Sequence, residues 1–100
     1  MTAFESMTNV DGTITRTADA RVPVLDRGFL YGDSIYEVFR TYRGIPLFYA
    51  EHWRRFENSA ALIRMRIGLT LDELTAAIRA TIAATGAPRL GADVYVRYVV

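Results

Sequence analysis

The sequence lacks both cysteine and lysine. Without cysteine, the chain can form no disulfide bond, no thiolate nucleophile and no cysteine-based zinc site. Without lysine, no side-chain amine of this chain can form a Schiff base with a carbonyl compound. The single histidine, His52, offers no metal-ligand spacing, so we predict no metal site.

Long hydrophobic runs and common catalytic signatures are also missing. No apolar run approaches the roughly 20 residues that a membrane helix needs, and the first ten residues do not resemble a signal peptide. These absences predict a cytoplasmic protein with no membrane segment. There is no glycine-rich nucleotide-binding motif and no G-x-S-x-G nucleophile elbow.

Charge is balanced along the chain. All twelve basic residues are arginine, and they are interleaved with eleven acidic residues, which gives a net charge of +1. No block of like charge forms a basic patch, so we predict no nucleic-acid binding. The hydrophobic fraction of 51% favours a packed globular core over disorder.

Turn signals and periodicity predict an α+β domain with a mostly antiparallel sheet and two helices packed on one face. We predict that residues 15–28 form an irregular segment that crosses the surface of the domain. The expected elements are a hairpin about Asp11-Gly12, strands at 34–42 and 45–49 joined by a turn at Arg43-Gly44, helices at 50–65 and 70–85, and a last strand at 92–100.

Both predicted helices carry an apolar stripe. Thr70 and Glu73 form a capping-box pattern at the start of the second helix, and Gly86 ends it. The residues expected to be buried are Trp53, Phe56, Ala60 and Ile63 on the first helix, and Leu71, Leu74, Ile78 and Ile82 on the second.

Strand alternation assigns four polar side chains to one face of the sheet. If the helices cover the aliphatic face, Tyr36, Arg40, Tyr95 and Arg97 share the other one. Tyrosine hydroxyls beside guanidinium groups suit a small carboxylate. A solvated sheet face is the alternative interpretation.

A second polar group lies on the first helix, where His52, Arg55 and Ser59 share a face. This group could hold an anion, or it could be an ordinary polar helix surface. Glu37 falls on the core face of its strand, where a structural ion pair or backbone hydrogen bonds are expected, with a catalytic role as the alternative.

The last strand ends on Tyr98-Val99-Val100 with no turn residue after it. An unprotected apolar strand at an edge invites pairing. We therefore expect residues 1–100 to be the N-terminal portion of a longer protein.

Two blocks together resemble the N-terminal signature of the fold-type IV pyridoxal-phosphate enzymes, the class IV aminotransferases. This family includes branched-chain and D-amino acid aminotransferases and 4-amino-4-deoxychorismate lyases. The similarity is close over residues 26–66 and extends in layout over 67–100. The matching blocks are Asp26-Arg27-Gly28, Tyr31-Gly32 and Tyr36-Glu37, followed by Glu51-His52-Trp53-Arg54-Arg55-Phe56, where the family has leucine in place of Phe56.

The resemblance implies a role for several residues. The arginine of E-H-x-x-R binds the phosphate of pyridoxal 5'-phosphate in the family, and it falls on Arg55. The aromatic of F/Y-E lines the substrate pocket and falls on Tyr36, while Tyr31 resembles the aromatic that reaches toward the partner subunit's site. The last strand resembles the Y-x-R of branched-chain enzymes, which implies that Tyr95 and Arg97 help to hold the substrate carboxylate.

The catalytic residues are expected outside this chain. In the family, the Schiff-base lysine and the glutamate that pairs with the pyridine nitrogen lie well beyond residue 100. The resemblance therefore implies that the 100 residues form the small N-terminal domain, with an incomplete last strand, and are inactive alone. It also implies a homodimer or higher homo-oligomer.

The resemblance predicts a transaminase that acts on a branched-chain amino acid with 2-oxoglutarate. Branched-chain enzymes usually read F-E-G where this chain reads Tyr36-Glu37-Val38, which is more similar to D-amino acid and (R)-amine enzymes. Those activities and aminodeoxychorismate lyase stay open within the family. A non-catalytic small-molecule-binding domain is the alternative from another class.

Overall fold

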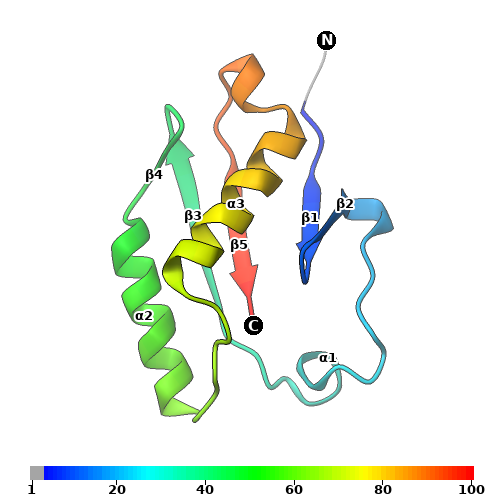
Figure 1. The fold of residues 1–100 in the computed structure, drawn as a ribbon, viewed down its shortest axis with the longest axis vertical. Coiled ribbons are helices and arrows are strands. Elements are labelled where there is room, and N and C mark those ends of the chain that lie inside the picture. The colour runs from blue at the N-terminus through cyan, green and yellow to red at the C-terminus, as the bar shows by residue number, and fades with distance from the viewer. Residues whose placement is uncertain (1–3) are drawn as a thin grey trace.

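The structure, a computed structural model, describes residues 4–100, and its elements follow the predicted α+β order (Figure 1). No helix within these residues is both long and apolar enough to cross a membrane. The elements are β1 Met7–Val10, β2 Thr13–Arg16, η1 Thr17–Asp19, α1 Arg27–Tyr31, β3 Tyr36–Tyr42, β4 Ile45–Pro46, α2 Tyr49–Leu62, α3 Leu71–Thr85, η2 Pro88–Leu90 and β5 Tyr95–Val99.

The strands form two sheets, and every pairing is antiparallel. β1 and β2 make a separate hairpin, whereas β3 lies between β4 and β5 in a three-stranded sheet. In the β3–β5 register, Tyr36 is opposite Val99 and Arg40 is opposite Tyr95. Two hydrogen bonds between Ile35 and Val100 continue this pairing beyond the strand ends.

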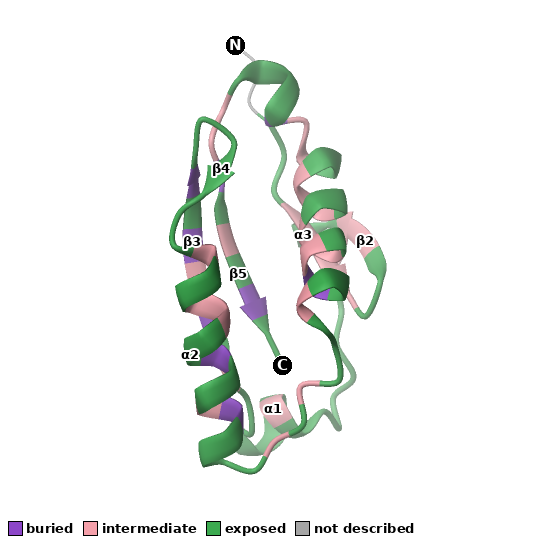
Figure 2. Cartoon of the chain, turned by 60° about the vertical axis from the view of Figure 1, so that its left-hand side comes forward, coloured by how far each residue is buried: buried purple, intermediate pink, exposed green. Residues whose placement is uncertain are grey.

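The core lies between the inner face of the β3–β5 pair and the two long helices, which confirms the predicted packing. One buried cluster joins Phe39 of β3, Phe56 of α2, Leu74 of α3 and Tyr98 of β5. The buried residues of α2, β3 and β5 lie along the interior of the molecule (Figure 2). α3 also packs against β1, so it joins the hairpin to the main sheet.

Both tight turns have the backbone geometry that their residues predict. Asp11 and Gly12 have φ angles of 51° and 97°, as a type I′ turn between two strands requires. Arg43 and Gly44 repeat this pattern between β3 and β4, with φ angles of 51° and 78°. The second turn fixes the end of β3, the strand that carries the candidate site residues.

The ends of α3 are also as predicted. The Thr70 hydroxyl accepts a hydrogen bond from the Glu73 backbone N–H at 3.1 Å, and the Glu73 carboxylate accepts one from the Thr70 N–H at 2.9 Å. This reciprocal capping box satisfies two N–H groups that the first turn leaves unpaired. Gly86 ends the helix with a φ of +80°.

Three expectations about local structure were wrong. The return strand stops at Pro46, because Phe48 adopts a left-handed conformation that starts α2 at Tyr49. Helix α2 ends at Leu62, so Ile63 leaves the apolar stripe and is 52% exposed. The expected irregular crossing contains the short helix η1 and runs into α1, which the Asp26 carboxylate caps by accepting from the Phe29 N–H.

Candidate functional site

Two groups of polar side chains lie on opposite faces of β3. Successive residues of a strand point to opposite sides of the sheet, so Tyr36 faces outward while Glu37 faces the helices. Tyr36 is 56% exposed, and Glu37 is 5% exposed. The candidate site residues are therefore divided between an outer face and an inner cluster.

The outer face brings together the four residues that alternation predicted. Tyr95 is opposite Arg40 in the β3–β5 register, and Arg97 is opposite Val38, one diagonal step from Tyr36. The Arg97 guanidinium carbon lies 4.3 Å from the centre of the Tyr36 ring. All four polar side chains are exposed on this face.

The outer face has the chemistry of an anion-binding surface. A guanidinium stacked on an aromatic ring keeps its N–H donors at its edge, where they can bind a carboxylate through two parallel hydrogen bonds. The stacking contributes about 0.5–1 kcal/mol at an exposed site and restricts the rotation of Arg97. Arg40 adds a second positive charge to the same face. The binding roles of Tyr36, Tyr95 and Arg97 stay predictions.

The inner cluster is built around the Glu37 carboxylate. Arg55 Nε donates to Oε2 at 2.9 Å, and Arg55 Nη2 donates to Oε1 at 2.8 Å. His52 Nδ1 lies 2.7 Å from the same Oε1, and it must be the donor because an ionised carboxylate only accepts. These contacts agree with the structural ion pair expected for Glu37.

The electrostatics of the cluster favour an ionised Glu37. The hydrogen bonds from Arg55 hold the pKa of the Glu37 carboxyl below its usual range, and they outweigh burial, which acts in the opposite direction. The His52 hydrogen bond lowers the Glu37 pKa further. The same pairing raises the pKa of Arg55. Ser59, which was predicted to share this helix face, is not among the residues that hydrogen-bond Glu37.

Arg55 faces solvent with part of its guanidinium. Its side chain is 68% exposed and lines a shallow depression together with Phe48, Glu51 and His52. A guanidinium has five N–H donors, and Glu37 engages only Nε and one N–H of Nη2. The remaining donors fit an anionic group such as a phosphate, although the Glu51 carboxylate at the rim opposes it. The phosphate-binding role of Arg55 stays a prediction.

Tyr31 lies on α1, an element that carries no residue of either group. Its side chain is 66% exposed, and the Arg27 guanidinium carbon lies 4.9 Å from its ring centre. Asp33 holds Arg27 in turn through a salt bridge at 2.7 Å. The expected contact of Tyr31 with a partner subunit stays a prediction.

The sequence did not identify Asp93, which fixes the end of β3. Its carboxylate accepts hydrogen bonds from the Thr41 hydroxyl at 3.0 Å and from the Gly44 N–H at 3.1 Å. The backbone N–H groups of Gly44 and Arg43 hold the pKa of Asp93 below its usual range. No local pattern could reveal this contact, because about fifty residues separate Asp93 from the turn.

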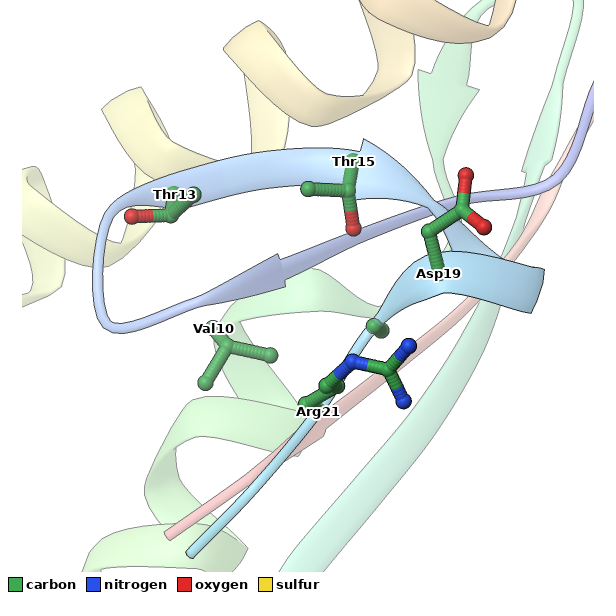
Figure 3. Close-up of a pocket in the computed structure, with 6 residues that line it drawn as sticks. Val10, Thr13, Thr15, Asp19 and Arg21 are labelled. Atoms are coloured by element: carbon green, nitrogen blue, oxygen red, sulfur yellow. The ribbon is translucent and has the colours of Figure 1, made fainter.

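A second shallow depression lies between the β1–β2 hairpin and the segment after η1 (Figure 3). Its lining residues include Val10, Thr13, Thr15, Asp19 and Arg21. None of these side chains is buried. Hydroxyls with one acid and one base on an open surface do not form a defined binding site, so we assign no site there.

Comparisons with known proteins identify close similarities. Residues 34–100 match the family model described as amino-transferase class IV. A D-alanine aminotransferase of Staphylococcus haemolyticus is 37% identical over 70 residues, which cover 70% of this chain and 25% of that protein. A putative branched-chain-amino-acid aminotransferase of Methanocaldococcus jannaschii is 33% identical over 91 residues, which cover 91% of this chain and 30% of that protein.

Solved structures have the same fold. The branched-chain aminotransferase of Thermoproteus uzoniensis, determined with norvaline, gives a TM-score of 0.72 at 30% identity over 89% of this chain and 30% of its own. A second branched-chain amino acid aminotransferase, complexed with N-(5'-phosphopyridoxyl)-L-glutamate, gives a TM-score of 0.72 at 30% identity. The match covers 95% of this chain and 32% of that one. This chain therefore spans between a quarter and a third of the length of these relatives.

Proposed function

Because the chain belongs to the class IV aminotransferase family, we propose that residues 1–100 form the small N-terminal domain of a pyridoxal 5'-phosphate-dependent transaminase. The proposed reaction moves an amino group between a branched-chain amino acid and 2-oxoglutarate. The observation that carries this proposal is the outer face of β3 and β5, where Arg97 stacks on Tyr36 beside Tyr95 and Arg40.

The outer face would hold the substrate by its carboxylate. Arg97 would donate two hydrogen bonds, and the Tyr95 hydroxyl would complete the contact. Fixing the carboxylate removes rotational freedom before the proton at the α-carbon is transferred. The second carboxylate of 2-oxoglutarate would find a further cation in Arg40, whereas an aliphatic side chain would lie on the Tyr36 ring.

Arg55 would hold the cofactor phosphate with the N–H donors that Glu37 leaves unengaged. When bound, pyridoxal 5'-phosphate supplies the electron sink for the charge that develops at the substrate α-carbon. The residues of this chain would contribute binding and orientation. The amine that attaches to the cofactor must come from outside these residues, because they include no lysine.

D-amino acid transamination is the second candidate. Three D-alanine aminotransferases from Staphylococcus are 37% identical to this chain over 70 residues, and Tyr36-Glu37-Val38 resembles the start of D-amino acid enzymes. Branched-chain enzymes support the first candidate through their structures and through the Tyr95-Val96-Arg97 pattern. Both candidates use the same outer face.

A homodimer or higher homo-oligomer is part of the proposal. The exposed Tyr31 ring on α1 would contribute to the site of a partner subunit. The cytoplasm is the proposed location, since amino acids and 2-oxo acids are metabolites of that compartment.

Assaying the full-length protein with L-leucine and with D-alanine, each with 2-oxoglutarate, distinguishes the two candidates. We expect activity with L-leucine. Arg40→Leu should raise KM for 2-oxoglutarate more than KM for the oxo acid of leucine, because only the dicarboxylate needs a second cation. Arg97→Leu should raise both KM values, because Arg97 would hold the carboxylate that the two substrates share. Arg79→Leu, an exposed arginine on α3, is the matched control. Activity on D-alanine alone would favour the second candidate, and no transamination of either would favour a non-catalytic binding domain.

Replacing adjacent arginines tests the phosphate role. Arg55→Ala should weaken pyridoxal 5'-phosphate binding by at least about tenfold, the loss of one hydrogen bond to a charged group. Arg54→Ala should leave the dissociation constant unchanged, because Arg54 is exposed and takes no part in the Glu37 cluster. Equal dissociation constants for the two variants would show that Arg55 does not bind the phosphate.

A further inference from the structure

Glu37 is buried and ionised, and it accepts hydrogen bonds from Arg55, the side chain proposed to bind phosphate. Contact with the substrate does not explain the role of this carboxylate, because Glu37 points away from the outer face, where the substrate would lie. It also points away from solvent, so it cannot contact a cofactor directly. Its contacts are with His52 and Arg55 of α2.

We propose that Glu37 is the positioning residue for Arg55: by accepting from Nε and Nη2, it fixes the guanidinium plane so that the remaining N–H donors face a phosphate-bearing ligand. This inference rests on the proposed phosphate role of Arg55. The two hydrogen bonds, at 2.9 and 2.8 Å, define the orientation of a planar group completely. A single contact would leave the plane free to rotate.

The position of Glu37 on a rigid strand makes this role effective. β3 is the central strand of its sheet, and Glu37 is opposite the buried Tyr98 on β5. His52 donates to the same carboxylate oxygen and restricts its rotation. An exposed arginine otherwise loses rotamer freedom when it binds an anion. Glu37 imposes most of that ordering before the ligand arrives.

The negative charge of Glu37 has the opposite effect, since it repels a phosphate. Glu37 is buried, so salt screens this repulsion only weakly. The Arg55 guanidinium would lie between the two anions and would offset the repulsion with its own positive charge. Nothing else in the cluster reduces the conformational freedom that a loose arginine must lose, so we expect positioning to outweigh repulsion.

Three ligands and two substitutions of Glu37 distinguish the loss of Arg55 positioning from the loss of the Glu37 charge and from damage to the fold. The full-length protein, prepared without cofactor, is titrated with pyridoxal 5'-phosphate, inorganic phosphate and pyridoxal, which lacks the phosphate. Glu37→Gln removes the charge, while Glu37→Asp keeps it on a side chain too short to reach both nitrogens. Glu57→Gln, on the exposed surface of the same helix as Arg55, is the matched control.

Both Glu37 variants should weaken binding of pyridoxal 5'-phosphate and inorganic phosphate by about tenfold, as expected for one hydrogen bond to a charged group. Pyridoxal binding should not change, and Glu57→Gln should match the wild type. In an Arg55→Ala background, Glu37→Gln should have no further effect, because Glu37 acts through Arg55.

Other outcomes overturn the inference in different ways. Tighter phosphate binding by Glu37→Gln with no change in Glu37→Asp would mean that charge repulsion dominates. Equal weakening of all three ligands, or an undiminished effect in the Arg55→Ala background, would mean a purely structural role. If Arg55→Ala weakens phosphate binding but the Glu37 variants do not, only the positioning role is wrong. If Arg55→Ala itself has no effect, the proposed phosphate site is wrong and the inference fails with it.

Discussion

Replacing Glu37 by glutamine should destabilise the β3–α2 contact by an amount that depends on pH. The His52 side chain is 19% exposed, so its 2.7 Å hydrogen bond to Glu37 is largely shielded from water. A hydrogen bond to a charged group contributes about 1.5–3 kcal/mol. Solvent screens the pair with the exposed Arg55, and glutamine retains one acceptor oxygen. We therefore expect a loss of about 1–2 kcal/mol at pH 7.

The pH dependence follows from the lowered pKa of Glu37. A carboxyl whose pKa is lower in the folded state contributes stability above its unfolded pKa of about 4.3, and this contribution is lost as the pH falls through the folded value. Glutamine does not titrate. The difference between wild type and Glu37→Gln should therefore be constant from pH 7 to about pH 5 and should shrink at more acidic pH.

Hydrogen exchange in the full-length protein can measure this difference, because it reports the free energy of local opening. Peptides covering β3 and α2 should exchange faster in Glu37→Gln at pH 7, and their protection should converge with the wild type in acid. Glu57→Gln should show no effect at either pH. A difference that stays the same below about pH 3 would mean that the ionised carboxylate is not what stabilises this contact.

Two further substitutions test the core and the helix start. Tyr98→Phe should leave the free energy of unfolding unchanged or raise it by up to about 1 kcal/mol, because the buried Tyr98 hydroxyl has no hydrogen-bond partner within residues 4–100. Urea unfolding measures this free energy. A loss above about 1 kcal/mol would show that the hydroxyl is paired. Thr70→Ala should cost about 1 kcal/mol by removing the capping box of α3, whereas Thr13→Ala, at the exposed start of β2, should have little effect.

Local signals in the sequence predicted most of the fold. The Asp11-Gly12 and Arg43-Gly44 turns, the capping box at Thr70 and the helix end at Gly86 all depend on a few adjacent residues, and the structure has each of them. Strand alternation also assigned the outer face correctly, because the period of a strand is independent of its partners.

The errors occurred where distant contacts or unusual backbone angles decide the structure. Phe48 has a φ of 54°, which a bulky residue adopts only when its surroundings require it. This conformation ends β4 after two residues, and propensity could not predict it. Asp93 was missed for a related reason, since its hydrogen bonds reach a turn on another strand.

The adjacent pair Tyr36-Glu37 explains how one short motif can serve two parts of a site. A strand directs neighbouring side chains to opposite faces, so Tyr36 lies against Arg97 on the outer face while Glu37 holds Arg55 on the inner one. A shift of one residue in β3 would exchange both contacts at once. The β3–β5 register therefore fixes the proposed substrate-binding residues and the proposed phosphate-binding residue together, even though they lie on different faces. The sequence predicted the two faces separately, but only the paired strands and α2 show that a single register controls both.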